Sequence, residues 1–151
     1  MNKKYQVSVK IIIIGLLLDI ISKFLVTSNM NLYDSIKIIN NFFSITYIYN
    51  DGAAWSILKG QMNFFYLITI FALIVMGYLL KTSKSMIQNV AFSLMIAGTL
   101  GNFIDRIRLE KVIDFLNFVI FNYDFPVFNV ADMCLTIGAI ILVFSIIKDG
   151  E

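Results

Sequence analysis

The stretch that decides the fold is Val130–Ile147, which reads VADMCLTIGAIILVFSII and carries one charged residue, Asp132. A helix of this length extends for about 27 Å, close to the thickness of the hydrocarbon core of a bilayer. Three runs upstream have a similar apolar character. We therefore expect an all-α polytopic membrane protein with four transmembrane helices, at about residues 10–27, 63–80, 86–105 and 130–148.

The composition agrees with this interpretation. Of 151 residues, 59% are hydrophobic, and the mean hydropathy is +0.83, whereas a soluble domain is nearer half apolar. The length leaves room for about four spans and their loops, so residues 1–151 are expected to form a single membrane-embedded domain. A signal peptide is the alternative for the first run, but Asp19 and Lys23 interrupt it and no small-residue cleavage site follows Val26.

The distribution of basic residues favours one orientation in the membrane. Lysines at both termini and in the 81–85 connection lie directly beside the spans, whereas the basic residues of the two long connections are spread out. Basic residues concentrated beside the spans favour the cytoplasmic side. We therefore expect both termini and the 81–85 loop in the cytoplasm, with the long connections on the outer side.

The two outer connections have their own predicted structure. Ile36–Ile39 and Phe42–Tyr49 are rich in β-branched and aromatic residues, which predicts short strands and a small extracytoplasmic β-containing subdomain. Residues Phe115–Phe128 are rich in phenylalanine and contain the only proline, Pro126. Because aromatic residues accumulate at the membrane–water interface, this segment is expected to lie along the outer surface.

The absence of histidine excludes several kinds of catalytic site. It removes Ser-His and Cys-His nucleophile pairs and HExxH zinc sites. Cys134 is the only cysteine, so there is no disulfide framework, and a net charge of +2 without a basic run gives no indication of nucleic-acid binding. Acid–base chemistry would fall to carboxylates, Lys, Tyr or bound ions, and no cofactor or metal site is expected.

Ionisable residues near the outer ends of the spans are functional candidates, because charges in or beside a bilayer are costly. Asp19 and Lys23 form an i,i+4 pair, which favours an ion pair that attaches the first helix to its neighbours; contact with a site is the alternative. Asn102, Asp105 and Arg106 share one helix face. They could belong to a site or form an interfacial anchor in which Arg106 snorkels to headgroups.

Two further carboxylates could form a catalytic pair. Asp114 has apolar neighbours, which favour its neutral form, while Asp132 follows Asn129 with the spacing of a helix capping box, and a helix N-terminus favours the charged form. Two such groups can hold a water between them. The charged one takes a proton from the water and the neutral one polarises a substrate carbonyl. This would hydrolyse a peptide without histidine or metal, with Asp132 as the resting base and Asp114 as the acid.

Five motifs, in order along the whole chain, resemble those of the lipoprotein signal peptidases, also called signal peptidase II. They are Asp19–Lys23 (DIISK), Asn50–Ser56 (NDGAAWS), Gly101–Arg106 (GNFIDR), Val112–Phe115 (VIDF) and Phe128–Asp132 (FNVAD). The resemblance implies an aspartic endopeptidase of the bacterial inner membrane, with its active site near the outer face. Its substrates and partners would be diacylglyceryl-modified prolipoproteins, cut before the lipidated cysteine, and membrane phospholipid, and we expect a monomer.

The resemblance also implies roles for individual residues. Asp114 and Asp132 would be the catalytic pair. The residues that bind substrate or orient the site would be Asn50, Gly52, Asn102, Arg106 and Asn129, and the structural polar residues would be Asp19, Lys23 and Asp105.

The chain departs from the family pattern in two places. Ala97–Leu100 stands where the family usually has Gly-Gly-Ala, which bears on close helix packing. Glu110 stands where the family tends to have glycine, four residues before the first catalytic aspartate, which bears on the local turn.

Two other functions compete with the peptidase interpretation. A small proton-coupled transporter would also use intramembrane carboxylates, but it needs them near the midplane, and no inverted repeat is visible. A non-catalytic membrane scaffold leaves the concentration of Asn and Asp at the outer face unexplained.

Overall fold

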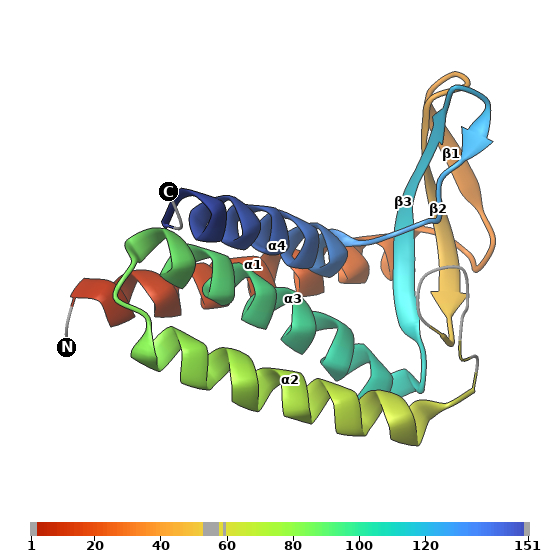
Figure 1. The fold of residues 1–151 in the computed structure, drawn as a ribbon. Coiled ribbons are helices and arrows are strands. Elements are labelled where there is room, and N and C mark those ends of the chain that lie inside the picture. Colours follow the sequence, from red (N-terminus) through yellow and green to blue (C-terminus); the bar gives the residue numbers. More distant parts are fainter. Residues whose placement is uncertain (1–2, 53–57, 59, 150–151) are drawn as a thin grey trace.

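The computed structural model describes residues 3–52, 58 and 60–149, which form four helices and a four-stranded antiparallel sheet (Figure 1). The helices are α1 (Lys3–Asn29), α2 (Met62–Thr82), α3 (Met86–Leu109) and α4 (Val130–Asp149). The strands, in spatial order, are β1 (Ser35–Ile39), β2 (Phe43–Asn50), β3 (Val112–Ile120) and β4 (Tyr123–Asp124). The Ala53–Ser56 part of the NDGAAWS motif lies outside the described residues.

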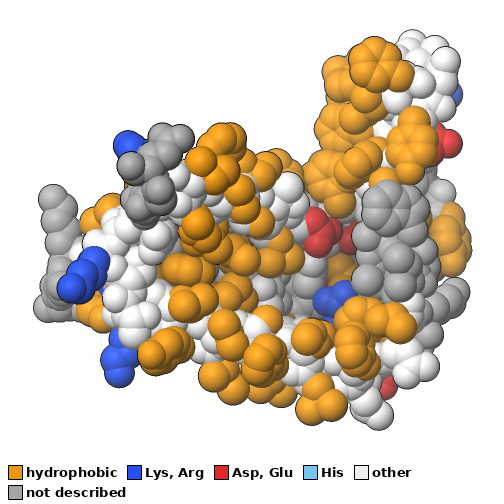
Figure 2. Space-filling model, in the orientation of Figure 1, with side chains coloured by type: hydrophobic (Ala, Val, Ile, Leu, Met, Phe, Trp, Pro, Cys, Tyr) orange, Lys and Arg blue, Asp and Glu red, His pale blue; other side chains and the backbone are white. Residues whose placement is uncertain are grey.

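Three of these helices are long and apolar enough to cross a membrane by length and composition. They are α2, α3 and α4 up to Lys148, with mean hydropathies of 2.1, 1.3 and 2.4. The first helix, α1, is the longest, at 27 residues, but it also carries Asp19 and Lys23. Apolar side chains cover most of the helix-bundle face seen in Figure 2, as expected for a surface that faces lipid.

The helices pack closely around α3, which contacts the other three. A Cβ atom at Gly98 would overlap the backbone oxygen of Ala131 in α4, and one at Gly101 would overlap the carboxylate of Asp19 in α1. These two glycines therefore allow α3 to approach both neighbours. The family departure at Ala97–Leu100 retains this close packing, because Ala97 is buried against Gly15 of α1.

The predicted short connection between α2 and α3 is present. Helix α2 ends at Thr82, and Ser85 caps α3 by accepting a hydrogen bond from the Gln88 backbone. Lys4 of α1 donates hydrogen bonds to the backbone oxygens of Lys81 and Ser83. This connection and both chain ends lie at the same end of the bundle (Figure 1).

The sheet lies at the opposite end of the bundle (Figure 1). The strands predicted at Ile36–Ile39 and Phe42–Tyr49 are confirmed as β1 and β2. The segment Phe115–Phe128 was expected to lie along the outer surface. Most of it forms β3 and β4, with β3 paired to β2 and β4 paired to β3.

The start of β3 belongs to a hydrophobic cluster that the local sequence does not reveal. Ile113 and Phe115 of β3 are buried with Val26 of α1 and Tyr47 of β2. Aromatic content alone favours the membrane interface, but Phe115, the first residue of the segment, is buried inside the protein. This cluster fixes β3, and with it Asp114, against the end of α1.

Glu110 makes the turn between α3 and β3. It caps the helix in the left-handed conformation (φ 54°), and its backbone N–H donates to the Arg106 oxygen at 3.0 Å. Glycine adopts this conformation without steric cost, which explains why glycine suits this position. The departure at Glu110 therefore keeps the turn, and the turn leads the chain back toward the ends of α3 and α4.

Candidate active site

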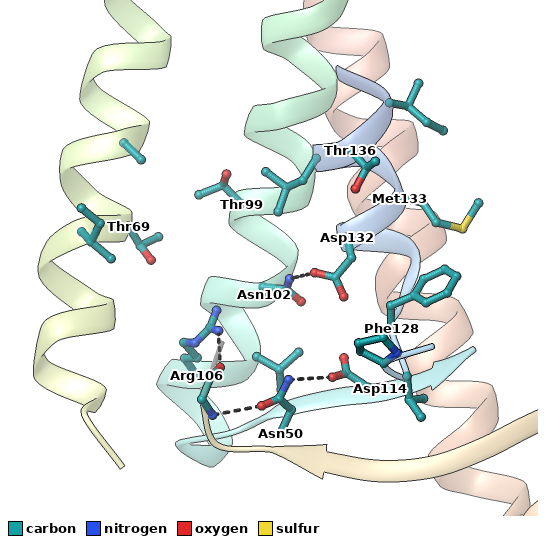
Figure 3. A pocket seen from close by; sticks show the side chains of 18 of the residues that line it. Asn50, Thr69, Thr99, Asn102, Arg106, Asp114, Phe128, Asp132, Met133 and Thr136 are labelled. Atoms are coloured by element: carbon teal, nitrogen blue, oxygen red, sulfur yellow. Dashed lines mark hydrogen bonds between the residues drawn. The ribbon is translucent and has the colours of Figure 1, made fainter. Parts of the chain in front are cut away.

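A cavity of about 860 Å³ lies between the helices and the sheet, and Figure 3 shows the side chains that line it. Most of the lining is apolar. Figure 2 shows acidic and basic side chains gathered in this hollow among hydrophobic ones. The polar lining residues include Asn50, Thr69, Thr99, Asn102, Arg106, Asp114, Asp132 and Thr136.

Asp132 lies in the first turn of α4 and is held by a capping box. The Asp132 backbone N–H donates to Asn129 Oδ1 at 2.9 Å, and the Asn129 backbone N–H donates to Asp132 Oδ2 at 3.1 Å. The capping prediction is therefore confirmed. The other carboxylate oxygen, Oδ1, accepts a hydrogen bond from Asn102 Nδ2 at 2.7 Å. Both oxygens of Asp132 thus have fixed donors while the side chain faces the cavity (Figure 3).

Asp114 lies on β3 and is 2% exposed. Its Oδ2 accepts from Asn50 Nδ2 at 3.1 Å, and its Oδ1 accepts from Asn129 Nδ2 at 2.7 Å. Burial, and then the negative charge of Asp132, raise the pKa of the Asp114 carboxyl to about 7. The two amide hydrogen bonds and the positive charge of Lys23 act in the opposite direction.

Asn129 connects the two aspartates. It is fully buried, and its side-chain NH₂ contacts Asp114 while its backbone N–H contacts Asp132. The same NH₂ lies 3.0 Å from Asn102 Oδ1 and 3.2 Å from the Ile113 backbone oxygen. One residue at the start of α4 therefore brings together β3, α3 and α4.

Arg106 points into the cavity from α3 (Figure 3). Its Nη2 donates to the backbone oxygen of Gly52 at 3.2 Å, and its Cζ lies 4.7 Å from the centroid of the Phe65 ring. Its Nε is buried and has no hydrogen-bond partner among the described residues. The alternative in which Arg106 snorkels to lipid headgroups is therefore wrong, because the side chain turns inward.

The predicted ion pair between Asp19 and Lys23 is present, and it extends further than predicted. Lys23 Nζ lies 2.8 Å from Asp19 Oδ2 and 2.8 Å from Asp105 Oδ2, so α1 is joined to α3. The ammonium also donates to Asn102 Oδ1 at 3.2 Å. The ion pair therefore attaches α1 to a neighbour, as expected, and Lys23 also contacts Asn102, a residue that lines the cavity.

Comparison with known proteins agrees with this geometry. Residues 11–148 match the model of the family described as signal peptidase (SPase) II. The chain belongs to the signal peptidase II family. The resemblance predicted from five motifs is confirmed.

The relatives of this signal peptidase II align with it over nearly its whole length. The lipoprotein signal peptidase of Staphylococcus haemolyticus is 46% identical, over 100% of this chain and 98% of its own length. That of Staphylococcus epidermidis is 49% identical, with 99% and 96% covered. A solved bacterial membrane enzyme, determined at 2.3 Å resolution by the in meso method, is 41% identical with a TM-score of 0.91 and covers 97% of this chain and 90% of its own.

Membership of this family decides between the competing interpretations. A signal peptidase II is a protease of a bacterial membrane that removes signal peptides, so the proton-coupled transporter is not supported. The three apolar helices agree with a membrane location.

Three threonines that were not predicted as site residues line the cavity of this signal peptidase II. They are Thr69 of α2, Thr99 of α3 and Thr136 of α4. Thr99 precedes Asn102 by three residues and Thr136 follows Asp132 by four, so helical spacing places each on the same face as a predicted site residue. That spacing could have identified Thr99 and Thr136. Thr69 lies on a helix without any predicted site residue, and only the packing of α2 against α3 brings it to the cavity.

Proposed function

We propose that this chain is an aspartic endopeptidase that removes signal peptides from diacylglyceryl-modified prolipoproteins, cutting before the lipidated cysteine, with Asp114 and Asp132 as its catalytic pair. The observation that carries this proposal is that both carboxylates line one cavity and are bound by the same residue, Asn129. The raised pKa of Asp114, about 7, supports the sharing of one proton between two carboxylates.

The proposed reaction uses one water held between the two carboxylates. Asp132, charged and in the first turn of α4, takes a proton from this water, and the oxygen attacks the scissile carbonyl carbon. Asp114, protonated, donates its proton to the carbonyl oxygen. When the tetrahedral intermediate collapses, the C–N bond breaks, the proton on Asp132 passes to the leaving amine, and Asp114 recovers its proton as the carbonyl reforms.

Further residues would orient the pair and the peptide. Asn102 and Asn129 hold Asp132, while Asn50 and Asn129 hold Asp114, through the hydrogen bonds described above. The Nε of Arg106 is buried and donates no hydrogen bond to any of the described residues, and the guanidinium faces the cavity. We assign to Arg106 a hydrogen bond to a backbone carbonyl of the substrate, with Gly52 fixing the other end of the guanidinium.

The apolar wall of the cavity supports a lipid-bearing substrate. The cavity continues between α2 and α4, where it is lined by Ile68, Ala72, Leu135 and Ile137. Hydrocarbon chains on the substrate cysteine would bury apolar area there, and this contact would favour a lipidated over an unlipidated peptide. The relatives named above carry the name lipoprotein signal peptidase, which supports the same substrate class.

A direct test uses two peptides with one lipobox sequence, one carrying diacylglycerol on its cysteine and one without lipid. The purified protein should cleave the first before the cysteine and leave the second intact over the same period. Equal cleavage of both peptides would contradict the substrate proposal while leaving a peptidase in place.

We further propose a single domain over residues 1–151 that is monomeric and surrounded by phospholipid, with α1 as a fourth span and the site near the outer face. Supporting observations are the buried attachment of α1 to α3 through Lys23 and the position of both chain ends beside the 81–85 connection. Reporter fusions should place both termini and this connection in the cytoplasm and Asn50 outside. An outer location of the 81–85 loop would contradict this orientation.

A further inference from the structure

Two buried carboxylates hold the backbone immediately before each proposed catalytic aspartate. Asp105 Oδ2 accepts a hydrogen bond from the N–H of Ile113 at 3.2 Å, and Ile113 precedes Asp114. Asp19 Oδ1 accepts one from the N–H of Ala131 at 2.9 Å, and Ala131 precedes Asp132. The same kind of contact, from carboxylate to backbone, is therefore made once for each member of the pair.

Lys23 joins these two carboxylates. Its Nζ lies 2.8 Å from an oxygen of Asp19 and 2.8 Å from an oxygen of Asp105, and the residue is 3% exposed. The contact between Asp19 and Ala131 runs from α1 to α4, and the contact between Asp105 and Ile113 runs from α3 to β3. One ammonium group at the centre thus fixes how far apart these two backbone positions lie.

Lys23 also acts on Asp132 through a third path. Its Nζ donates to Asn102 Oδ1 at 3.2 Å, and Asn129 Nδ2 donates to the same oxygen at 3.0 Å. With its oxygen held by two donors, Asn102 must present its NH₂ to Asp132, which it contacts at 2.7 Å. If the side-chain amide of Asn102 were rotated by half a turn, its carbonyl oxygen would face the Asp132 carboxylate. The hydrogen bonds with Lys23, Asn129 and Asp132 would then all be lost.

We propose that Lys23 is a positioning residue, which sets the separation and orientation of Asp114 and Asp132 through Asp19, Asp105 and Asn102. This inference rests on the proposed function, because it requires that the two aspartates are the catalytic pair. Lys23 does not face the water or the peptide. Besides the positive charge that lowers the pKa of Asp114, its effect on turnover is carried by the backbone of Ile113 and Ala131 and by the amide of Asn102.

Stability alone does not account for this arrangement. A buried ion network loses hydration when it forms, and well-packed apolar residues of similar volume are often equally stable or more stable. Geometric precision is a different requirement, since a displacement of about 1 Å in a catalytic group can lower turnover by about 100-fold. The network restricts both aspartates by directional hydrogen bonds, which apolar side chains could not do.

The test compares variants of the full-length protein in detergent, with a diacylglyceryl lipobox peptide as substrate. Lys23→Met removes the ammonium at similar length, and Asp105→Asn keeps the shape while removing one charge. For each variant, kcat, KM and the melting temperature are measured. We expect kcat to fall by about 100-fold for Lys23→Met and about 10-fold for Asp105→Asn, with KM changed by less than about threefold.

The matched control is Gly15→Ala, which strains the α1–α3 contact about 12 Å along α1 from Lys23, where the added Cβ would meet Ala97 and Cys134 rather than the network. A Cβ at Gly15 would lie 2.9 Å from Ala97 Cβ, so α1 or α3 must shift slightly. This variant should lower the melting temperature and leave kcat within about twofold of the wild type. A purely structural role for Lys23 predicts instead that all three variants lose activity in proportion to their loss of folded protein.

Each result of these measurements supports or contradicts a positioning role for Lys23. If folded Lys23→Met turns over like the wild type, Lys23 is not a positioning residue. If Lys23→Met does not fold, Asp105→Asn decides in the same way, because it leaves Lys23 paired with Asp19. Failure of the proposed function is separate, since it would appear as activity in Asp114→Asn or Asp132→Asn, whatever the Lys23 variants do.

Discussion

Asn129 donates a hydrogen bond from its side-chain nitrogen to Asp114 Oδ1 at 2.7 Å. The same residue caps α4 and donates from its backbone to Asp132 Oδ2 at 3.1 Å. A helix cap is usually a local feature, worth about 1 kcal/mol to the helix that it begins. Here the cap also fixes a carboxylate on a strand 15 residues earlier in the chain. Helix stability and site geometry therefore depend on one side chain.

The proposed chemistry predicts the effect of neutralising either aspartate. Asp114→Asn and Asp132→Asn should each reduce kcat by about 10⁴-fold or more, because each removes one half of an acid–base pair. The cleavage assay with the diacylated peptide measures this directly. Both variants should remain folded, since asparagine keeps the shape and can still accept a hydrogen bond. Substantial turnover by a well-folded Asp114→Asn protein would eliminate the proposed mechanism.

The sequence was sufficient to predict the features that depend on local composition. The apolar run at 130–147 predicted a span, and the β-branched run at 36–39 predicted a strand. The spacing of Asn129 and Asp132 predicted a capping box, and all three elements are present as a helix, a strand and a cap. Each of these follows from properties of neighbouring residues, which act over a few ångströms. The order of the five motifs then gave the family.

Features that depend on tertiary contacts could not be predicted in this way. The direction of Arg106 is set by Gly52 and by the Phe65 ring, which lie 54 and 41 positions away in the sequence. Nothing beside Asp105 in the sequence indicates that its carboxylate binds the N–H of Ile113. These interactions depend on where α1, α2 and β3 pack, and packing is a property of the whole chain.

Glu110 gives a prediction about stability that is independent of the chemistry. Because Glu110 is exposed and adopts φ 54°, Glu110→Gly should stabilise the protein by up to about 1 kcal/mol through relief of the left-handed strain. Its kcat should not change. Glu110→Ala is the matched control, since alanine removes the carboxylate but keeps the Cβ atom. Thermal unfolding in detergent distinguishes them, and equal stabilisation by both would attribute the effect to charge rather than to backbone conformation.

The buried carboxyl of Asp114 predicts how stability depends on pH. Its pKa rises from an ordinary value of 3.8 to about 7 in the folded state, so the folded protein binds this proton more tightly than the unfolded chain. The stabilisation is fully present below pH 4 and is lost as the pH rises through about 7. Asp114→Asn should remove this contribution, so its free energy of unfolding, relative to that of the wild type, should increase between pH 5 and pH 8 by an amount on the order of a few kcal/mol. Thermal unfolding at each pH would show this as a melting temperature that rises relative to that of the wild type. A constant difference across this range would show that Asp114 does not titrate in this range.

The last prediction concerns which aspartate carries the resting proton. Asp114 is buried on β3, where loss of hydration favours the neutral acid, whereas Asp132 lies at the N-terminus of α4, where the helix dipole favours a charged carboxylate. We therefore expect Asp114 to be the resting acid and Asp132 the resting base. The titration belongs to the pair, so the assignment requires a measurement that identifies the protonated group itself.

Infrared spectroscopy of the protonated-carboxyl band near pH 6 provides this measurement. The band should be present in the wild type, absent in Asp114→Asn, and retained in Asp132→Asn, where loss of the neighbouring charge should move its disappearance to a lower pH. That shift follows from the negative charge of Asp132, which raises the pKa of Asp114 in the intact pair. Asp124→Asn is a suitable control, because Asp124 is exposed on β4 and does not line the cavity. A band that vanishes only in Asp132→Asn would exchange the two roles, with Asp132 as the acid and Asp114 as the base.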